Sequence, residues 1–483
     1  MKGKYSRRVA ALILIGGLTI GLLWYFAQIL LVKRLDGITT IQNFYVQPEN
    51  SVDVLMVGSS HMGMNIDPGE MWHANGISSY NLWGSVQPTW NSYFFLKEAL
   101  KYQTPKLVIM DAYGAINLNQ DYSDDARQVA NVLGMRMSLN KIQAIAASSP
   151  EERWNNMFLM YPIIHDRIDE VYIDDFLHFP WNKALVNEKG YSPAYGHYGV
   201  PFEFADEQGS SEVTELYPKS KEYLIRIIEL LKEKGIPMVL VQSPVPNAMG
   251  QEKQNNALEI IAEQYDVPFY NLNLLRVEMG IEQSDFLDIE HLNAIGARKM
   301  ARYLADILQE EYDLEDHRND PRYQSWEVYY QNNAKNYLKA ITDVGDYFSE
   351  LADREYTVIV VKNSTWEITD EFLQLLDAFA TITSDSKEIE ISSGGCWILD
   401  NPKKGEIINQ FFGDMQSTFE YDGHTFGVDF NAGLQVLFDK KVVSFMDGAG
   451  MCFLVYNKDT RECIDAVQFL ESEGFQLKHL FIE

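Results

Sequence analysis

The sequence predicts an α/β protein that follows a membrane-spanning helix and precedes a β-rich domain. Residues 9–32 are almost entirely apolar, and between 53 and 311 short apolar runs alternate with amphipathic helical patterns. After residue 353 the pattern changes to short strands separated by glycine-rich turns. Strands that alternate with helices build a parallel sheet covered on both faces. The expected fold is a flavodoxin-like three-layer α/β/α sandwich, followed by an α+β or β-sandwich domain.

The first 34 residues predict a membrane anchor. They hold six basic groups and no acids, and residues 9–32 are apolar apart from Thr19 and Gln28. As a helix this stretch is about 36 Å long, at about 1.5 Å per residue, which is enough to cross a bilayer. The basic tip favours a cytoplasmic N-terminus and an extracytoplasmic position for the bulk of the chain. A cleaved signal peptide is the alternative, but the apolar run is long and no clear small-x-small site follows it.

Five strands and their connecting helices are expected to form the α/β domain. The strands are short apolar runs, and the helices repeat apolar residues at three- and four-residue spacing. Residues 123–216 are less regular, and we interpret them as an insertion over the strand ends. The strands are expected at 53–57, 78–84, 106–111, 237–243 and 268–272, and the helices at 70–74, 87–102, 217–234, 251–265 and 293–311.

The C-terminal part of the chain changes in character. The polar stretch 313–321 marks a domain boundary, and a tyrosine-rich helix is expected over 324–352. A strand at 356–362 and a helix at 369–379 open the last domain. The expected parts are a basic tip and anchor at 1–34, the α/β domain at 35–312, a linker and helix at 313–352, and a β-rich domain at 353–483.

Composition excludes several classes of function. The formal charge is -29, and the chain beyond residue 34 carries 34 basic and 69 acidic residues, a net of -35. Such an acidic body repels phosphate backbones, so no nucleic-acid partner is expected. Cys396, Cys452 and Cys463 lack metal-type spacing, and no phosphate loop is present, so no metal and no cofactor are expected. Two of these thiols can form one disulfide if this part lies outside the cytoplasm.

The run at 52–61 is the first candidate for chemistry. It reads Val-Asp-Val-Leu-Met-Val-Gly-Ser-Ser-His, a buried strand that stops at Gly58 and is followed by Ser59, Ser60 and His61. Parallel folds place reactive groups where such strands end. A serine at this position is a candidate nucleophile.

The second candidate lies before the last helix of the α/β domain. There Asp288 stands three residues ahead of His291. An Asp at this spacing can turn back within one loop, so that its carboxylate accepts from one imidazole nitrogen and leaves the other for a hydroxyl. The alternative is a structural histidine at a helix start with the Asp as a nearby cap.

Together these motifs resemble the SGNH, or GDSL-like, hydrolase superfamily over roughly residues 50–310. The resemblance implies that Ser60, rather than Ser59, is the nucleophile, because Gly58-Ser-Ser60 matches Gly-Asp-Ser. It implies that His291 is the base and Asp288 its partner. Asn81-Leu-Trp-Gly84 matches the second block, whose glycine N–H joins the Ser60 N–H in the oxyanion hole.

One block of that family is missing. Its third block supplies an Asn side chain to the oxyanion hole, whereas this chain reads Met110-Asp-Ala-Tyr113 there. Asp111 and Tyr113 are candidate substitutes, but a carboxylate repels an oxyanion unless it is protonated or turned away, and a missing donor costs about 100-fold or more in rate. His61 is expected to point away from Ser60 on an extended stretch, so it and Tyr113 are candidate substrate contacts instead of bases.

The anchor narrows the resemblance. A transmembrane helix followed by Gly-Ser-Ser and Asp-x-x-His-Leu is similar to proteins that assist O-acylation of cell-surface polymers, namely alginate acetylation proteins and the D-alanine transfer protein of teichoic acid synthesis. The resemblance implies a membrane-bound O-acyltransferase as partner. It also implies that Ser60 carries the acyl group as an ester before a sugar hydroxyl removes it.

The C-terminal domain is similar to the interleukin-like EMT inducer family, which has lectin-like members. Residues 450–459 and 463–469 match its closing strands, although Gly450-Met-Cys452 replaces a more polar Gly-x-Asn. The resemblance implies glycan binding, and Trp366 and Trp397 are candidates for stacking on sugar rings, with core packing as their ordinary role.

The sequence thus favours a membrane-anchored serine acyltransferase or esterase that adds or removes O-acyl groups, acetyl first of all, on a cell-surface polysaccharide. The alternative is an inactive SGNH-like scaffold with a glycan-binding domain in a polysaccharide assembly machine. Loss of the Asn block favours the alternative, whereas retention of Ser60, His291, Asp288 and Gly84 favours the enzyme.

Overall fold

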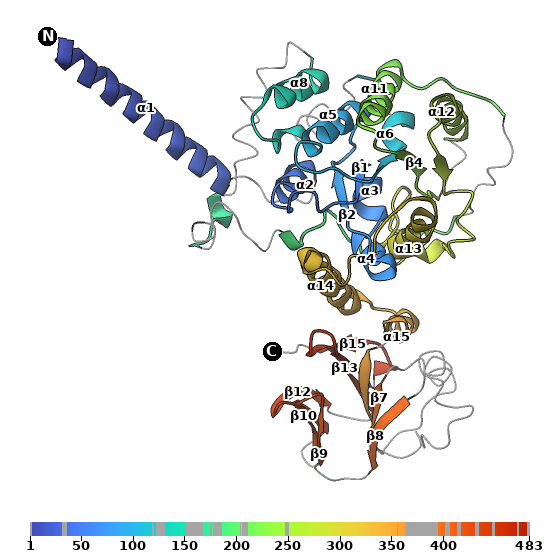
Figure 1. The fold of residues 1–483 in the computed structure, drawn as a ribbon. Coiled ribbons are helices and arrows are strands. Elements are labelled where there is room, and N and C mark those ends of the chain that lie inside the picture. The colour runs from blue at the N-terminus through green and yellow to red at the C-terminus, as the bar shows by residue number, and fades with distance from the viewer. Residues whose placement is uncertain are drawn as a thin grey trace. The chain divides into compact units, whose positions relative to one another are not determined.

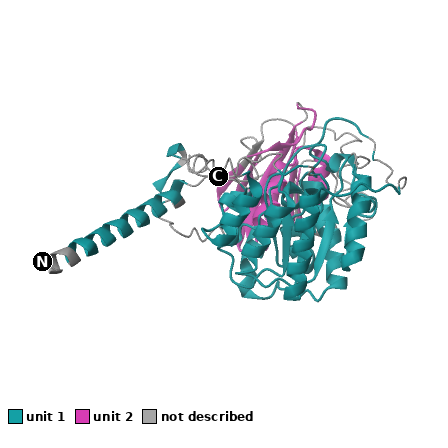
Figure 2. Cartoon of the chain, turned by 90° about the horizontal axis from the view of Figure 1, so that it is seen from above, with its two compact units in different colours: residues 1–330 teal, residues 331–483 magenta. Residues whose placement is uncertain are grey.

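A computed structural model of the chain contains two compact units, Met1–Tyr330 and Gln331–Glu483 (Figure 2). The structure describes residues 2–30, 36–117, 120–121, 131–150, 168–173, 176, 186–202, 204, 211–246, 251–354, 356–362, 395–400, 406–412, 417–429, 434–446, 450–470 and 473–480.

The N-terminal helix α1 (Lys2–Leu30) contains the apolar stretch expected to cross a membrane. Residues Arg7–Ala27 form a 21-residue segment of mean hydropathy 2.2 whose side chains are not buried in the protein. By length and composition this helix can span a bilayer, and a signal sequence near the N-terminus has the same properties.

The centre of unit 1 is a five-stranded parallel sheet (Figure 1). Its spatial order is β2-β1-β3-β4-β5, the order of flavodoxin-like doubly wound folds. Apolar side chains line both faces of the first four strands, because helices cover both faces. The strands are β1 (Val54–Gly58), β2 (Ser79–Trp83), β3 (Leu107–Asp111), β4 (Met238–Gln242) and β5 (Phe269–Asn271).

Helices pack on both faces of this sheet (Figure 1). One face carries α3 and α4, which both contact α13, and the other carries α5, α11 and α12. Helix α2 packs against β2, and α8 packs against α5. The helices of unit 1 after α1 are α2 (Gly37–Phe44), α3 (Ser60–Asn65), α4 (Pro68–Asn75), α5 (Thr89–Ala99), α6 (Tyr113–Ile116), α8 (Leu139–Ser148), α11 (Pro218–Lys234), α12 (Glu252–Tyr265) and α13 (Ala294–Glu311), with short 3-10 turns at η2 (Ile168–Glu170), η5 (Gln283–Asp285) and η6 (Pro321–Tyr323).

The prediction of a mixed α/β protein with a parallel sheet is confirmed, and the expected strands lie within a residue or two of those observed. Two expectations were wrong in detail. Residues 60–65 form helix α3 directly after β1 instead of a loop. The single helix expected over 324–352 is two helices, α14 (Gln324–Ala340) and α15 (Val344–Asp353), because Asp343 caps the second with its side chain. The helix expected at 369–379 lies outside the described residues.

Unit 2 contains two antiparallel sheets that share one apolar core. The larger has the order β15-β14-β13-β6-β7-β8 and the smaller β12-β11-β10-β9. Buried side chains from both sheets lie in the same cluster, which is the arrangement of a β-sandwich. The strands are β6 (Thr357–Lys362), β7 (Gly395–Asp400), β8 (Glu406–Phe412), β9 (Ser417–Tyr421), β10 (His424–Asp429), β11 (Leu434–Phe438), β12 (Lys441–Met446), β13 (Gly450–Asn457), β14 (Glu462–Leu470) and β15 (Lys478–His479).

The last strand of unit 2 is held by His479. Its Nδ1 lies 3.0 Å from Oδ2 of buried Asp465, and its Nε2 lies 2.7 Å from the carbonyl oxygen of Ile341. Both ring nitrogens therefore face acceptors, which suits the protonated ring. Burial lowers the pKa of His479, but the hydrogen bond to Asp465, the charge of Asp465 and the bond to the Ile341 carbonyl together outweigh it, so the pKa is raised above its ordinary value.

The three cysteines are free thiols. Cys396 on β7 and Cys452 on β13 both pair with Val361 of β6, which lies between them. Two strand spacings separate them by about 9.5 Å, beyond the roughly 7 Å that a disulfide spans. Trp397 is 1% exposed, so its indole packs in the protein and is not available to a sugar. Trp366 lies outside the described residues.

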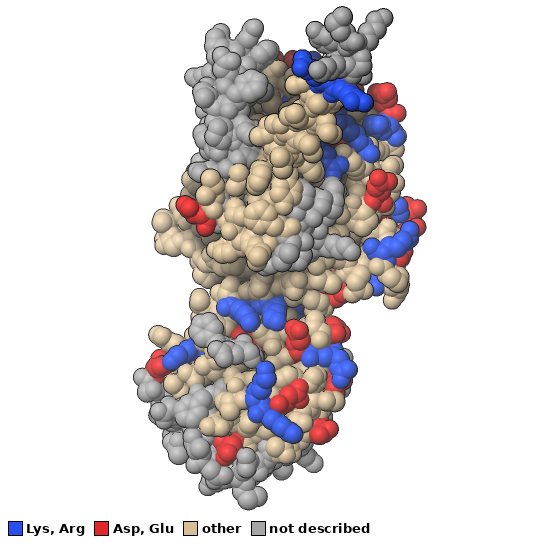
Figure 3. Space-filling view, turned by 90° about the vertical axis from the view of Figure 1, so that its left-hand side faces the viewer, with Lys and Arg blue, Asp and Glu red and all other residues tan. Residues whose placement is uncertain are grey.

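Charged side chains of both signs lie close together on the described surface. Figure 3 shows Lys and Arg side chains beside Asp and Glu side chains on one face. Arg318 and Asp316 lie 2.6 Å apart, and Arg322 and Asp320 lie 2.5 Å apart. Such exposed pairs contribute little to stability, because water screens them.

Candidate active site

The turn after β1 is shaped by a close approach of β3. A Cβ atom at Gly58 would overlap the Cβ of Asp111, so only glycine fits there without a shift of the backbone. This contact brings the Asp111 carboxylate under the next residue of the chain. The glycine of the Gly-x-Ser pattern is thus explained by packing between two strand ends.

Ser59 has a structural role at this turn. It is the N-cap of α3, and its Oγ accepts from the His61 N–H at 3.2 Å. The same hydroxyl donates to Oδ2 of Asp111, which also accepts from the Ser59 N–H at 3.1 Å. With its side chain buried and its hydroxyl used in both directions, Ser59 is not free to attack a substrate.

Ser60 is the first residue of α3 and meets the candidate base. Its Oγ lies 2.8 Å from Nε2 of His291, 231 residues away in sequence. This is hydrogen-bond distance for a nucleophile and its general base. The Ser60 N–H lies in the first turn of α3, where backbone N–H groups have no partner within the helix.

Asp288 completes the set of three. Both of its carboxylate oxygens lie 3.0 Å from Nδ1 of His291, so the ring donates from Nδ1 and presents Nε2 to Ser60. Oδ1 of Asp288 also accepts from the backbone N–H groups of Glu290 and His291, both at 2.8 Å. Burial raises the pKa of Asp288, but these hydrogen bonds outweigh it, so the pKa is lowered and the carboxylate is ionised near neutral pH.

The loop that carries Asp288 and His291 is closed at its base. Phe286 and Leu292 form an antiparallel bridge, and the Leu287 N–H donates to the carbonyl of His291 at 2.9 Å. Asn293 then caps α13 through its side chain. These bonds fix the loop in the geometry that an Asp-x-x-His spacing requires.

Asn65 joins the base loop to the nucleophile helix. It is the last residue of α3, and its Oδ1 accepts from the Leu292 N–H at 3.0 Å. Sequence reasoning missed this residue, because nothing in a lone Asn indicates a contact 227 residues away. The available signal for Asn65 was its position five residues after Ser60, at the end of the segment that follows the candidate nucleophile.

Asp111 does not face the position of an oxyanion. Its Oδ2 is bonded to Ser59, and its Oδ1 accepts from the Tyr113 N–H at 3.0 Å. Burial raises the pKa of Asp111 in spite of these hydrogen bonds. The carboxylate is therefore turned towards backbone and hydroxyl donors, and it supports the turn without supplying an oxyanion donor.

Gly84 was expected to supply an N–H to the oxyanion hole. Its N–H donates to the carbonyl of Gly58 at 3.2 Å, which extends the pairing of β1 with β2. In this structure the backbone continues its ladder for one residue beyond the strand, so this N–H is already bonded and its role in an oxyanion hole stays a prediction. The turn that follows includes Val86 at a φ of 48°, a strained conformation for a β-branched residue.

His61 and Tyr113 lie beside the base. The His61 ring centroid is 5.4 Å from that of His291 and 4.5 Å from that of Tyr113. His61 is 0% exposed, so it offers no surface to a substrate in this structure. Tyr113 is partly exposed, and burial, followed by Glu290 and Asp111, raises the pKa of its hydroxyl to about 12.

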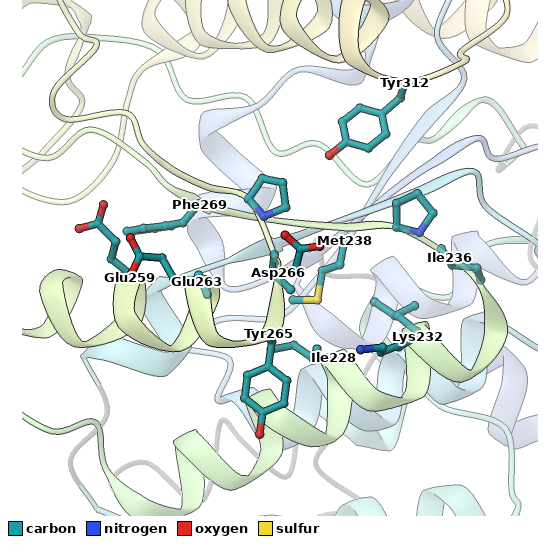
Figure 4. A pocket seen from close by; sticks show the side chains of 15 residues that line it. Ile228, Lys232, Ile236, Met238, Glu259, Glu263, Tyr265, Asp266, Phe269 and Tyr312 are labelled. Atoms are coloured by element: carbon teal, nitrogen blue, oxygen red, sulfur yellow. The ribbon is translucent and has the colours of Figure 1, made fainter.

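A cavity in the described part of the chain lies elsewhere (Figure 4). It has a volume of about 700 Å³ between the last turns of α11 and α12. Met238 and Phe269, the first residues of β4 and β5, line it, so it opens at the N-terminal edge of the sheet. Ser60 follows the C-terminal end of β1, so this cavity is at the opposite edge and has no part in the candidate site.

The fold and this site define an α/β protein in which a serine is hydrogen-bonded to a histidine and the histidine to an aspartate. Among the described residues, no group of three or more His, Cys, Asp or Glu side chains is arranged to hold a metal ion. The three residues are far apart in the sequence, since the serine follows the first strand and the other two follow the last. The fold brings them together.

Comparisons with known proteins give little further information. No family model matches the chain. No curated protein matches it. Among solved structures, it is similar to a protein of Bacteroides fragilis described as a "putative acylhydrolase", at 13% identity and a TM-score of 0.26, over 56% of this chain and 94% of that one. A likeness of that size gives no guidance on function.

Proposed function

We propose that the chain is a membrane-anchored, extracytoplasmic serine acyltransferase or esterase of the SGNH type. Its substrate would be an O-acyl group, acetyl first of all, on a cell-surface polysaccharide. The observation that carries the proposal is the contact of Ser60 Oγ with Nε2 of His291 at 2.8 Å, with Asp288 on the opposite nitrogen. The bilayer-length helix α1 supports the anchor.

The reaction would begin with attack by Ser60. Its Oγ bonds to the acyl carbonyl carbon while Nε2 of His291 takes the hydroxyl proton. Asp288 holds Nδ1–H and stabilises the imidazolium that forms. The tetrahedral intermediate then expels the donor oxygen, which takes the proton from His291, and the acyl group remains on Ser60 as an ester.

The second half of the reaction would decide between transfer of the acyl group and its hydrolysis. A sugar hydroxyl gives its proton to Nε2 of His291 and attacks the ester carbonyl. The bond to Ser60 Oγ then breaks, Oγ takes the proton back from Nε2, and the acyl group stays on the sugar. Water in the same position releases the free acid. A membrane-bound O-acyltransferase is the proposed partner that would supply the acyl group on the outer side of the membrane.

Charge on the carbonyl oxygen would be stabilised by few donors. The Ser60 N–H at the start of α3 is one, and the partly exposed Tyr113 hydroxyl is a second candidate. Because Asp111 is bonded to Ser59 and Tyr113, its carboxylate does not oppose the oxyanion directly. A rate below that of an enzyme with a full set of donors is therefore expected.

Covalent labelling tests this proposal. A fluorophosphonate probe added to the detergent-solubilised full-length protein is expected to label the wild type and not Ser60→Ala, which keeps the fold because it removes one partly exposed hydroxyl. Hydrolysis of an aryl acetate ester should be lost in the same variant. An unlabelled wild type, or labelling that persists in Ser60→Ala, would refute Ser60 as the nucleophile.

A second candidate function is an inactive scaffold that binds glycan through unit 2. The bond from the Gly84 N–H to Gly58, together with Asp in the place of Asn at position 111, favours it, because both reduce the number of oxyanion donors. A glycan array probed with the full-length protein distinguishes the two. Glycan binding by a protein that the probe does not label would support the scaffold.

A further inference from the structure

His61 is a buried histidine next to the candidate base, and no side chain or backbone group in the described part of the chain forms a hydrogen bond with its ring. Less than 1 Å² of Nδ1 or Nε2 is accessible, and neither has a hydrogen-bond partner among the described residues. An unpaired buried polar group costs about 1–3 kcal/mol. Phenylalanine would fill a similar space without that cost, so the presence of a histidine here calls for an explanation.

The ring of His61 packs between two side chains of the candidate site. Its centroid lies 5.4 Å from that of His291, with the planes at 69°, and 4.5 Å from that of Tyr113, with the planes at 41°. Its place on α3, one residue after Ser60, fixes it against the base. His61 therefore contacts the base without reaching the reacting atoms.

The His61 ring is neutral in the pH range in which a serine hydrolase works. Burial, together with the nearby His291, lowers the pKa of His61 to about 3. A neutral imidazole has one N–H and one lone pair, and because neither nitrogen is bonded, either one can carry the hydrogen. Because the His61 ring itself is fully buried, its dipole acts at low effective dielectric.

We propose that His61 is a positioning residue for His291. When His291 takes the serine proton, the neutral His61 ring turns its lone pair and dipole to the new imidazolium and favours the charged form. The inference rests on the proposed function, in which His291 is the base for Ser60. His61 forms no bond to the substrate and keeps its own proton throughout.

Other charged and titratable groups face the same pair of rings. Asp288 is bonded to His291 and favours its protonated form. Asp111 acts on His291 from the end of β3, and the Tyr113 hydroxyl stays protonated below about pH 12. None of these changes when His61 is replaced, so the replacement isolates its contribution.

His61→Phe in the full-length protein tests the proposal. The fluorophosphonate labelling rate near pH 7 is expected to fall about ten-fold, and the acid midpoint of the rate profile should move to lower pH, because His291 loses a group that favours its protonation. The melting temperature should stay the same or rise, since two unpaired nitrogens are removed. His73→Phe, an exposed histidine stacked on Tyr330, is the matched control and should change neither rate nor midpoint.

A direct titration separates this inference from the proposed function. Imidazole NMR of ¹⁵N-histidine protein, with His291 assigned by its substitution, gives the pKa of His291 whether or not the protein reacts with the probe. A lower pKa in His61→Phe supports the inference. An unchanged pKa, or a loss of rate without a shift of the midpoint, overturns it. A wild type that the probe does not label refutes the proposed function alone.

Discussion

Two adjacent serines should separate stability from reactivity. Ser59 caps α3 and donates to the buried carboxylate of Asp111, whereas Ser60 faces His291. Ser59→Ala removes an N-cap, at about 0.5–2 kcal/mol, and a hydrogen bond to a charged group, at about 1.5–3 kcal/mol. The expected loss is about 2–5 kcal/mol of the free energy of unfolding.

Thermal unfolding by circular dichroism measures this loss. A domain of this size loses about 2–4 °C per kcal/mol, so Ser59→Ala should melt roughly 5–15 °C below the wild type. Below its melting temperature it should still react with the fluorophosphonate probe. Ser60→Ala should melt within about 2 °C of the wild type and show no labelling, since its hydroxyl supports no other group in the described part of the fold.

Ser138→Ala provides the matched control. Ser138 caps α8 by accepting from the Lys141 N–H at 3.2 Å, as Ser59 does for α3, and it has no carboxylate partner among the described residues. Ser138→Ala should lower the free energy of unfolding by about 1 kcal/mol. Equal losses in the two cap variants would show that the Asp111 bond adds nothing. A Ser59→Ala protein that keeps its melting temperature but no longer labels would make Ser59 the nucleophile.

Three further predictions concern the base, the strand end and unit 2. Asp288→Asn should lower the labelling rate about 10³- to 10⁴-fold with little change in melting temperature, because the amide favours the wrong tautomer of the base. Gly58→Ala should destabilise unit 1 by about 1–3 kcal/mol or more in denaturant unfolding, because its Cβ would overlap the Cβ of Asp111. Because the pKa of His479 is raised in the folded protein, its bond to Asp465 stabilises unit 2 fully below about pH 6.5, the ordinary pKa of histidine. This stabilisation is lost as the pH rises through the raised pKa. Protection of the amides of the last strand against hydrogen exchange measures the loss.

Controls for these variants are present in the chain. A Cβ atom at Gly199 would meet nothing within 4 Å, and this glycine has no positive φ, so Gly199→Ala should leave stability unchanged. Full activity of Asp288→Asn would contradict its place beside the base. Protection factors of the last strand that do not change with pH, or that change in the same way in His479→Gln, would show that the histidine does not hold this strand.

The sheet and the base loop could be predicted because their signals are local. A buried parallel strand is a short apolar run, and five such runs alternate with helices. The pairing of Asp288 with His291 follows from a spacing of three residues in one loop. Such features depend on residues that are close together in the sequence, so a single sequence is enough to predict them.

Other parts of the site depend on contacts between distant segments. Residues 60–65 have a low helix propensity, with Gly63 and Asn65 among six residues, and form a helix through the Ser59 cap and tertiary packing. The bond between Asp111 and Ser59 joins two strand ends 52 residues apart. Neither contact has a signature in the local pattern.

The position of His61 could not be predicted for the same reason. On an extended stretch adjacent side chains point in opposite directions, whereas on a helix they lie about 100° apart. The sequence led us to expect only that His61 points away from Ser60, and the helix brings its ring against His291. Nothing in the local pattern indicates that this ring is completely buried.

The base loop is built as a closed unit with its own supports. Its bridge between Phe286 and Leu292 and its cap at Asn293 orient the aspartate and histidine without help from the sheet, and the Asn65 bond sets only where the loop docks. The effects of substitutions in the two halves of the site can therefore be distinguished. A substitution at the sheet edge would displace an intact base from its nucleophile, and a substitution in the loop would disorient the base beside a nucleophile that is still in place.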